Sequence, residues 1–391
     1  MSQPLPTRAV SMSRIPSLDG LRALSIFLVL ALHTMQGLPH ALPLIWYAIF
    51  NGDTGVFIFF VISGYLITSL LLHEQQKNGS ISMRSFYFRR AMRILPPIYF
   101  YVAILLLLGL AGRLAVTKID IFSALFFFRN YATGTSMWSL EHFWTLSVEE
   151  QFYLIWPFVL YLCLRHRSGL SGRTAAAKVA FVVILVSPII RVVSFLLPVP
   201  YLHHGGMFQM RADALMFGCV VALLQGTPAF ERAYSFATKI WWVPPVVIFL
   251  SDCMGARFQN YWNFPLGFTV TGIAIAFFLL WCVRNPSSVV GRVLNARPVV
   301  HIGVLSYSIY IWQTLFLHRG NEAIFGPSLK FIRTFPGNWL AILIVAEISY
   351  YVVEQPSLRL RTRLMRHFSA LSPRSKRTIA DMNQKPIDIK S

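Results

Sequence analysis

Ten apolar stretches, each suited to crossing a lipid bilayer, limit the possible folds of this chain more than any other feature. The hydrocarbon core of a bilayer is about 30 Å thick, and an α-helix of roughly 20 apolar residues spans it. Since lipid offers no partner to backbone polar groups, spanning segments are helices or closed barrels. The expected spans are approximately 18–38, 53–72, 95–112, 144–164, 178–198, 207–225, 240–253, 264–283, 298–318 and 337–356. We therefore predict an all-α, polytopic membrane protein.

Composition and the distribution of positive charge support this class. The chain is 55% hydrophobic and 13% charged, and its net charge of +20 could by itself indicate a nucleic-acid partner. With a cytoplasmic N-terminus, however, the inner segments hold 26 of the 35 Lys and Arg residues and the outer segments hold seven. Cytoplasmic loops of membrane proteins carry such an excess. We therefore expect both termini in the cytoplasm, multi-pass insertion in the cytoplasmic (inner) membrane, contact with membrane lipids, and no nucleic acid.

Other segments fit the same organisation. Four scattered cysteines form no Cys/His cluster, so we expect neither a metal site nor a disulfide framework. The first apolar run lacks a signal-peptide cleavage site, and many similar runs follow it, so we interpret it as the first span. Residues 119–129 are apolar but too short to span, and we expect a half-inserted or interfacial helix there. We assign 1–357 to a transmembrane domain and 358–391 to a mobile basic cytoplasmic tail.

The first span carries two ionisable residues, Arg22 and His33, eleven positions apart. Eleven residues correspond to about three helical turns, so both side chains lie on one face with roughly 16 Å of rise between them. A lone histidine in a helix is more often a core residue bonded to a carbonyl group. Its pairing with Arg22, and the presence of carboxylates expected at a similar depth, favour a functional role.

Carboxylates and arginines elsewhere extend this polar path. Glu149 and Glu150 open the fourth span and are expected near His33, in the outer half of the bundle. Adjacent helical residues point about 100° apart, so we expect one glutamate, Glu149 in preference, at the site and the other against a neighbouring helix. Arg211 and Asp213 open the sixth span and could equally form an internal ion pair that only holds helices together.

A second group of candidate residues lies towards the cytoplasm. Arg89, Arg90 and Arg93 could be ordinary positive-inside residues, but Arg93 shares a helix face with each of the other two. Such clustered guanidinium groups suit phosphates. Ser63 and Gly64 lie in the middle of the second span, where the glycine permits either close helix packing or the close approach of an extended ligand.

These residues occur within motifs that resemble the membrane-bound acyltransferase 3 family over residues 14–357. The motifs are, in order, SLDGLRALSIFLVLALH with Arg22 and His33, GVFIFFVISGYLIT with Ser63 and Gly64, FYFRRAMRILP with Arg90 and Arg93, FWTLSVEEQFYLIWP, SYSIYIWQ, and YYVVEQP with Tyr351 and Glu354. The resemblance implies a ten-helix core that moves an acyl group, usually acetyl, from cytoplasmic acyl-coenzyme A (acyl-CoA) to a hydroxyl group outside.

The resemblance also implies roles for individual residues. The essential histidine and arginine of the family correspond to His33 and Arg22, and the family's Arg-x-x-Arg and Tyr-x-x-Glu positions to Arg90, Arg93 and Glu354. Two features depart from the family pattern. Many relatives have a histidine where this chain has Gln313. Some relatives carry an extracytoplasmic esterase-like domain, and we expect no counterpart of it in this protein. We therefore expect the protein to act alone or with a separate partner.

From these residues we expect an O-acyltransferase that bears no permanent cofactor. His33 would be the catalytic base, oriented by Glu149 or Glu150, and Arg22 would contact the donor or stabilise developing negative charge. Arg90 and Arg93, helped by Arg89, would hold acyl-CoA phosphates, and the donor would extend past Ser63 and Gly64. Glu354 would belong to the same acyl-CoA-binding site. The expected acceptor is a surface or exported carbohydrate such as O-antigen, exopolysaccharide or a lipo-oligosaccharide. A lipid-linked form of this carbohydrate is one of the acceptors considered. The alternatives are a secondary transporter with a buried proton relay, and the same chemistry with another donor or a hydrophobic small acceptor.

Overall fold

All regular secondary structure in the described part of the chain is helical. A computed structural model describes residues 16–37, 42–166, 169–197 and 205–370. The long helices are α1 (Pro16–Gln36), α3 (Gly52–Asn78), α4 (Met83–Leu110), α6 (Phe143–His166), α7 (Gly169–Leu196), α8 (Phe208–Leu224), α9 (Pro228–Lys239), α10 (Val243–Phe258), α12 (Phe268–Arg284), α14 (Arg297–Leu317), α16 (Gly337–Ser349) and α17 (Gln355–Ala370).

Short helical segments connect the long ones. The α-helical ones are α2 (Leu44–Ile49), α5 (Lys118–Leu125), α11 (Asn260–Trp262), α13 (Val289–Leu294) and α15 (Glu322–Phe325). Three 3₁₀ turns, η1 (Trp138–Leu140), η4 (Arg319–Asn321) and η5 (Pro327–Arg333), lie between long helices, and two π-helical turns, η3 (Asn263–Gly267) and η6 (Tyr350–Glu354), lead into α12 and α17.

The prediction of an all-α, multi-pass membrane protein is confirmed. Each of the ten predicted spans overlaps a helix, and seven helical segments among the described residues are both long and apolar enough to cross a bilayer. Helices α6, α8 and α10 are not among those seven: α8 and α10 have 17 and 16 residues, and α6 contains Glu149 and Glu150. The number of crossings and their orientation stay predictions from the sequence.

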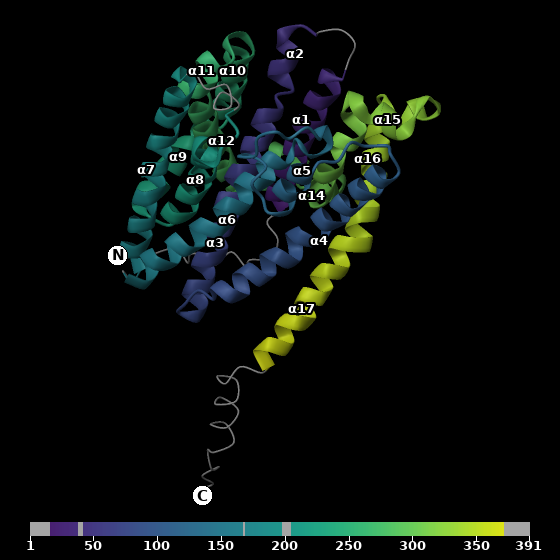
Figure 1. The fold of residues 1–391 in the computed structure, drawn as a ribbon. Coiled ribbons are helices and arrows are strands. Elements are labelled where there is room, and N and C mark those ends of the chain that lie inside the picture. Colours follow the sequence, from purple (N-terminus) through teal and green to yellow (C-terminus); the bar gives the residue numbers. More distant parts are fainter. Residues whose placement is uncertain (1–15, 38–41, 167–168, 198–204, 371–391) are drawn as a thin grey trace, which may run out of the picture.

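Helix α1 packs against α3 and α14, while α3 also packs along α8, which in turn lies against α7 (Figure 1). Close approach of α3 and α8 depends on two glycines. A Cβ atom on Gly64 would lie 1.9 Å from the Leu215 carbonyl oxygen, and one on Gly218 would lie 2.0 Å from the Val61 carbonyl oxygen. Small residues allow helix backbones to approach in this way. This contact fixes the position of α3, which contributes to every cavity described below.

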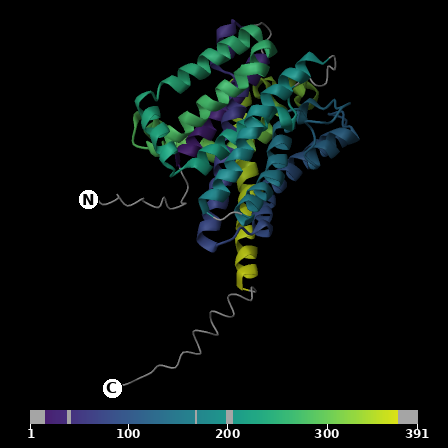
Figure 2. The ribbon, with the colours of Figure 1, turned by 90° about the vertical axis from the view of Figure 1, so that its left-hand side faces the viewer.

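Helix α17 projects beyond the bundle in two perpendicular views (Figures 1 and 2). It continues from the π-helical turn η6 and packs against α4. The expected boundary after residue 357 falls within this helix, which extends to Ala370. The first part of the predicted tail is therefore a helix next to α4, and the remaining tail residues, 371–391, lie outside the described residues.

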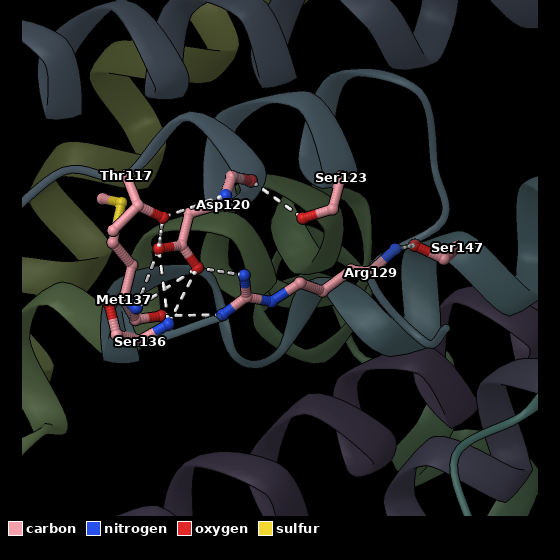
Figure 3. A network of polar contacts seen from close by, with 7 residues as sticks. All are labelled: Thr117, Asp120, Ser123, Arg129, Ser136, Met137 and Ser147. Carbon is pink, nitrogen blue, oxygen red and sulfur yellow. Dashed lines mark hydrogen bonds and ion pairs between the residues drawn. The ribbon is translucent and has the colours of Figure 1, made fainter. Parts of the chain in front are cut away.

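A buried ion pair holds the segment between α4 and α6 (Figure 3). The Asp120 carboxylate in α5 accepts hydrogen bonds from the Arg129 guanidinium, the Thr117 hydroxyl and the backbone N–H groups of Ser136 and Met137. Asp120 and Arg129 side chains are 0% and 6% exposed. Burial alone would raise the pKa of Asp120, but the hydrogen bonds from Thr117, Arg129 and Met137 outweigh it, and the pKa is lowered.

The same network ties this segment to α6. The backbone N–H of Arg129 donates to the Ser147 hydroxyl at 3.1 Å, and its guanidinium donates to the Met137 carbonyl at 3.1 Å. Helix α5 (Lys118–Leu125) overlaps the segment 119–129, for which a half-inserted or interfacial helix was expected. The network positions η1 and the residues after it, which form one wall of the candidate site.

Candidate active site

Three cavities lie in series through the bundle, and adjacent ones share wall residues. We name them the histidine cavity, the central cavity and the arginine cavity. Their volumes are about 500, 80 and 540 Å³ respectively. The histidine and central cavities share Val56, Thr145 and Tyr310, and the central and arginine cavities share Arg90 and Arg93. By the predicted orientation, the histidine cavity is the outer one and the arginine cavity faces the cytoplasm.

The histidine cavity contains a half-buried imidazole with one nitrogen available. The Nδ1 of His33 lies 3.2 Å from the Gln36 side-chain oxygen, one turn further along α1. Because that oxygen can only accept, Nδ1 donates the proton and Nε2 keeps its lone pair. Among the described residues Nε2 has no hydrogen-bond partner. His33 therefore meets the geometric requirement for a base facing a cavity.

A second histidine of this cavity, His142, is fully engaged. Its Nε2 lies 3.1 Å from the Ile311 carbonyl oxygen, so Nε2 is the donor, and Nδ1 accepts from the Thr314 hydroxyl at 2.8 Å. The side chain is 4% exposed. His142 thus anchors the start of α6 to α14 and has no lone pair left for proton transfer.

Besides aliphatic residues such as Leu32 and Leu317, the histidine cavity is lined by polar and aromatic side chains suited to a polar ligand. These are Gln36, Asp53, Glu141, Trp144, Thr314, His318 and Arg319. The His318 ring stacks on Trp138 with centroids 4.6 Å apart, and its Nδ1 accepts from the Gly320 N–H. Flat rings and mixed polar groups of this kind suit a sugar.

The central cavity brings together charged residues from α1, α4 and α6. Glu149 accepts from the Ser63 hydroxyl at 2.8 Å and from the Tyr153 hydroxyl at 3.3 Å. The Arg90 guanidinium lies 3.7 Å from the Tyr153 ring centroid, and both Glu149 and Glu150 interact electrostatically with it. Arg22 lines the same cavity and lies 3.6 Å from Asp19 on its own helix.

Basic side chains are the largest group among the residues that line the arginine cavity. It contains all three predicted arginines, together with residues that were not singled out from the sequence: His73, Lys77 and Arg361. Arg89 donates to Glu74 at 2.8 Å, and Glu74 is the acidic residue in this wall. Arg361 comes from α17, so the projecting helix closes one side of the cavity. The clustering of Arg89, Arg90 and Arg93 that was predicted from their spacing is present in the structure.

Several predicted arrangements differ from the structure. Glu149 and Glu150 do not share a cavity with His33: they line the central cavity with Arg22 and Arg90, whereas His33 lines the histidine cavity. Glu149 and Glu150 lie nearly two turns after the start of α6 at Phe143, and this position places them on the central cavity. The expected orientation of His33 by a glutamate is therefore wrong, since Gln36 makes that contact. Both glutamates face one cavity, contrary to the prediction for adjacent residues.

Two further predictions need correction. Gly64 does not line the central cavity, although Ser63 does, because Gly64 faces the Leu215 backbone of α8. The predicted pair of Arg211 and Asp213 is also not formed. Asp213 accepts from Arg191 of α7 at 2.8 Å, both side chains being 0% exposed.

Glu354 lies behind the central and arginine cavities. It is 3% exposed, accepts from the Ser308 hydroxyl at 3.3 Å, and interacts electrostatically with Arg93 and Arg22. Glu354 is not among the residues that line these two cavities, and its interactions with Arg93 and Arg22 fit a role in holding them. Glu354 belongs to the π-helical turn η6, which aims it towards α4.

Some residues of the site carried no separate signal in the sequence. Gln36 lies one turn after His33, a spacing that could have indicated their contact. Thr145 and Tyr310 are uncharged, and Arg361 looked like part of a basic tail, so only packing identifies them as cavity residues. Among the described residues, no three His, Cys, Asp or Glu side chains are grouped as metal ligands would be.

Comparison with known proteins gives the class of this protein. The sequence matches the family model Acyl_transf_3, described as an acyltransferase domain, over residues 15–352. The chain belongs to this family, and the resemblance noted from the motifs is confirmed. No solved structure gives a significant match.

Curated relatives include two bacterial O-acetyltransferases. The O-acetyltransferase OatA of Staphylococcus aureus (strain NCTC 8325 / PS 47) is 28% identical over 359 residues, which cover 88% of this chain and 57% of that protein. The peptidoglycan O-acetyltransferase OatA of Listeria monocytogenes serovar 1/2a is 28% identical over 377 residues, which cover 90% of this chain and 57% of that protein. The chain thus spans less than two thirds of the length of these relatives.

Proposed function

We propose that this protein is a membrane O-acetyltransferase that takes an acetyl group from acetyl-CoA on the cytoplasmic side. The acceptor in this proposal is a hydroxyl group of a cell-envelope carbohydrate. The observation that carries the proposal is the series of cavities from a basic cavity, suited to an anionic donor, to a cavity that contains an imidazole with a free Nε2. Membership of the acyltransferase family and the named activity of the relatives support it.

The donor would bind with its phosphates in the arginine cavity. Arg89, Arg93 and Arg361 supply guanidinium groups from two helices, and such groups bind phosphate oxygens through paired hydrogen bonds. The Nε of Arg90 is buried without a hydrogen-bond partner among the described residues, which leaves it available to a bound anion or carbonyl group. The thioester end would enter the central cavity beside Arg22 and Ser63.

The transfer step would take place next to His33. The acceptor oxygen forms a bond to the thioester carbonyl carbon, the carbon–sulfur bond breaks, and Nε2 takes the hydroxyl proton and returns it to the thiolate. General-base assistance of this kind contributes about 10²–10⁴-fold. Transfer through an acetyl group carried briefly on Nε2 uses the same geometry, and the proposal includes both routes.

The acceptor would occupy the histidine cavity. Trp144 and His318 provide flat surfaces, the His318 ring being stacked on Trp138, and Asp53 and Glu141 can accept hydrogen bonds from sugar hydroxyls. The name of the Listeria relative makes peptidoglycan the first glycan to test, followed by exported polysaccharide and lipo-oligosaccharide.

The test is transfer of label in permeabilised cells that express the full chain. We expect ¹⁴C from acetyl-CoA to appear as base-labile ester in envelope carbohydrate, and His33→Ala to reduce this by about 10²–10⁴-fold. The matched control is His301→Ala, since His301 lies on α14 paired with Glu347 at 2.5 Å and lines none of the three cavities. Unchanged transfer by His33→Ala would contradict the mechanism, and flux of solute without label transfer would indicate the rival transporter.

A further inference from the structure

We propose that Val56, Thr145 and Tyr310 form a collar between the central and histidine cavities, and that this collar limits the acyl chain which can reach His33 to a short one. The inference rests on the proposed function, because it assigns acyl-length selection to the same transfer site.

The position of the collar follows from the cavity walls. Among the described residues, these three line both the central and the histidine cavity. They come from three different helices, α3, α6 and α14, so they surround the junction from separate sides. All three are buried, with 7%, 5% and 7% of their surface exposed. An acyl group that moves from one cavity to the other has to pass between them.

Hydrogen bonds close the polar side of the collar. The Thr145 and Tyr310 hydroxyl oxygens lie 2.5 Å apart, and they lie 3.0 and 3.1 Å from the carbonyl oxygen of His142. Two hydroxyl protons are available for these three contacts, so one hydroxyl donates to the other, and that second hydroxyl donates to the carbonyl group. Both hydroxyls are therefore held in place in either arrangement.

Neighbouring contacts make the collar rigid. The His142 ring uses both nitrogens to bind α14, so the carbonyl group that holds the two hydroxyls cannot shift independently of the helix that carries Tyr310. On the opposite side, Val56 is β-branched, and such side chains have few rotamers in a helix. The opening is consequently set by fixed groups and not by flexible side chains.

The consequence for the donor depends on where the reactive groups lie. Arg90 and Arg22 are on the central side, whereas His33 is reached only from the histidine side. The thioester carbonyl must therefore come to the collar with its alkyl group at the narrow point. The methyl group of an acetyl thioester is the smallest alkyl group that an acyl donor can bring to this point, and each added methylene has to fit against Val56 and the Thr145 methyl. A pocket distinguishes one methylene by about 10–200-fold.

The experiment compares acetyl-CoA, propionyl-CoA and butyryl-CoA as donors for the full chain in permeabilised cells. The readout is the ratio of kcat/KM for butyryl-CoA to that for acetyl-CoA, measured as ester released from envelope carbohydrate by mild base. Within one preparation this ratio does not depend on the amount of folded protein. We expect Val56→Ala, which removes two methyl groups from the collar, to raise the ratio at least about 10-fold.

A second variant and a matched control complete the test. Thr145→Ser removes one methyl group but keeps the hydroxyl, so the ratio should rise in the same direction by a smaller factor. Val61→Ala also removes methyl groups from a buried valine of α3, but Val61 lines neither cavity, and its ratio should equal that of the unmodified protein. Unchanged ratios in both collar variants overturn the inference while acetyl transfer stands. Failure of the unmodified protein to transfer acetyl overturns the proposed function, and the collar with it.

Discussion

Removal of the Asp120 carboxylate should destabilise the segment that leads to the candidate site. In Asp120→Ala the Arg129 guanidinium remains buried, 6% exposed, with its hydrogen bond to the Met137 carbonyl group but without its counter-charge. Removal of one partner of a buried ion pair costs about 3–5 kcal/mol. The backbone N–H groups of Ser136 and Met137 lose their acceptor as well.

The double variant Asp120→Ala/Arg129→Leu separates these contributions. It no longer contains an unpaired buried charge, but the two N–H groups still lack the carboxylate, at about 1 kcal/mol each. We therefore expect its free energy of unfolding to lie about 2 kcal/mol below that of the unmodified protein, and above that of Asp120→Ala. The measurement is denaturant unfolding of the purified protein in detergent, followed by tryptophan fluorescence.

A double variant whose loss equals the sum of the two single losses would refute this reasoning, because it would mean that the two side chains do not stabilise each other. The pH dependence gives an independent check. Because the pKa of Asp120 is lowered in the folded protein, its contribution is complete above the ordinary value of 3.8. It is lost as the pH falls below 3.8 towards the folded pKa, so the difference between Asp120→Ala and the unmodified protein should shrink only at strongly acidic pH.

Two further substitutions test contacts of the candidate site. Gln36→Leu removes the neutral 3.2 Å hydrogen bond to His33, and since such bonds contribute about 0.5–1.5 kcal/mol, kcat for acetyl transfer should fall about 2- to 13-fold, far less than in His33→Ala. A loss as large as that of His33→Ala would mean that Gln36 does more than orient the ring. Arg361→Ala should raise the KM for acetyl-CoA by up to about 10-fold with kcat unchanged, because it removes one half-exposed cation from the arginine cavity. Arg363→Ala, an exposed position on the same helix, should leave KM unchanged, and equal effects in the two variants would place the donor elsewhere.

The membrane-embedded helices could be predicted because their cause is local. A run of apolar residues of sufficient length has to be helical in lipid, since only the helix itself can satisfy its backbone groups. The eleven-residue interval in α1 likewise places Arg22 and His33 on one face, and the structure has them lining successive cavities. The clustering of Arg89, Arg90 and Arg93 follows from helical periodicity in the same way.

Contacts between helices could not be predicted, because they depend on how far each helix is rotated and how closely it approaches its neighbours. Asp213 is paired with Arg191 of α7 and not with its sequence neighbour Arg211. The close approach of α3 and α8 at Gly64 and Gly218 is another contact of this kind. The sequence alone thus determined a polytopic helical protein with a polar face on its first span. The tertiary structure alone decided that the glutamates and His33 lie in different cavities with a collar between them.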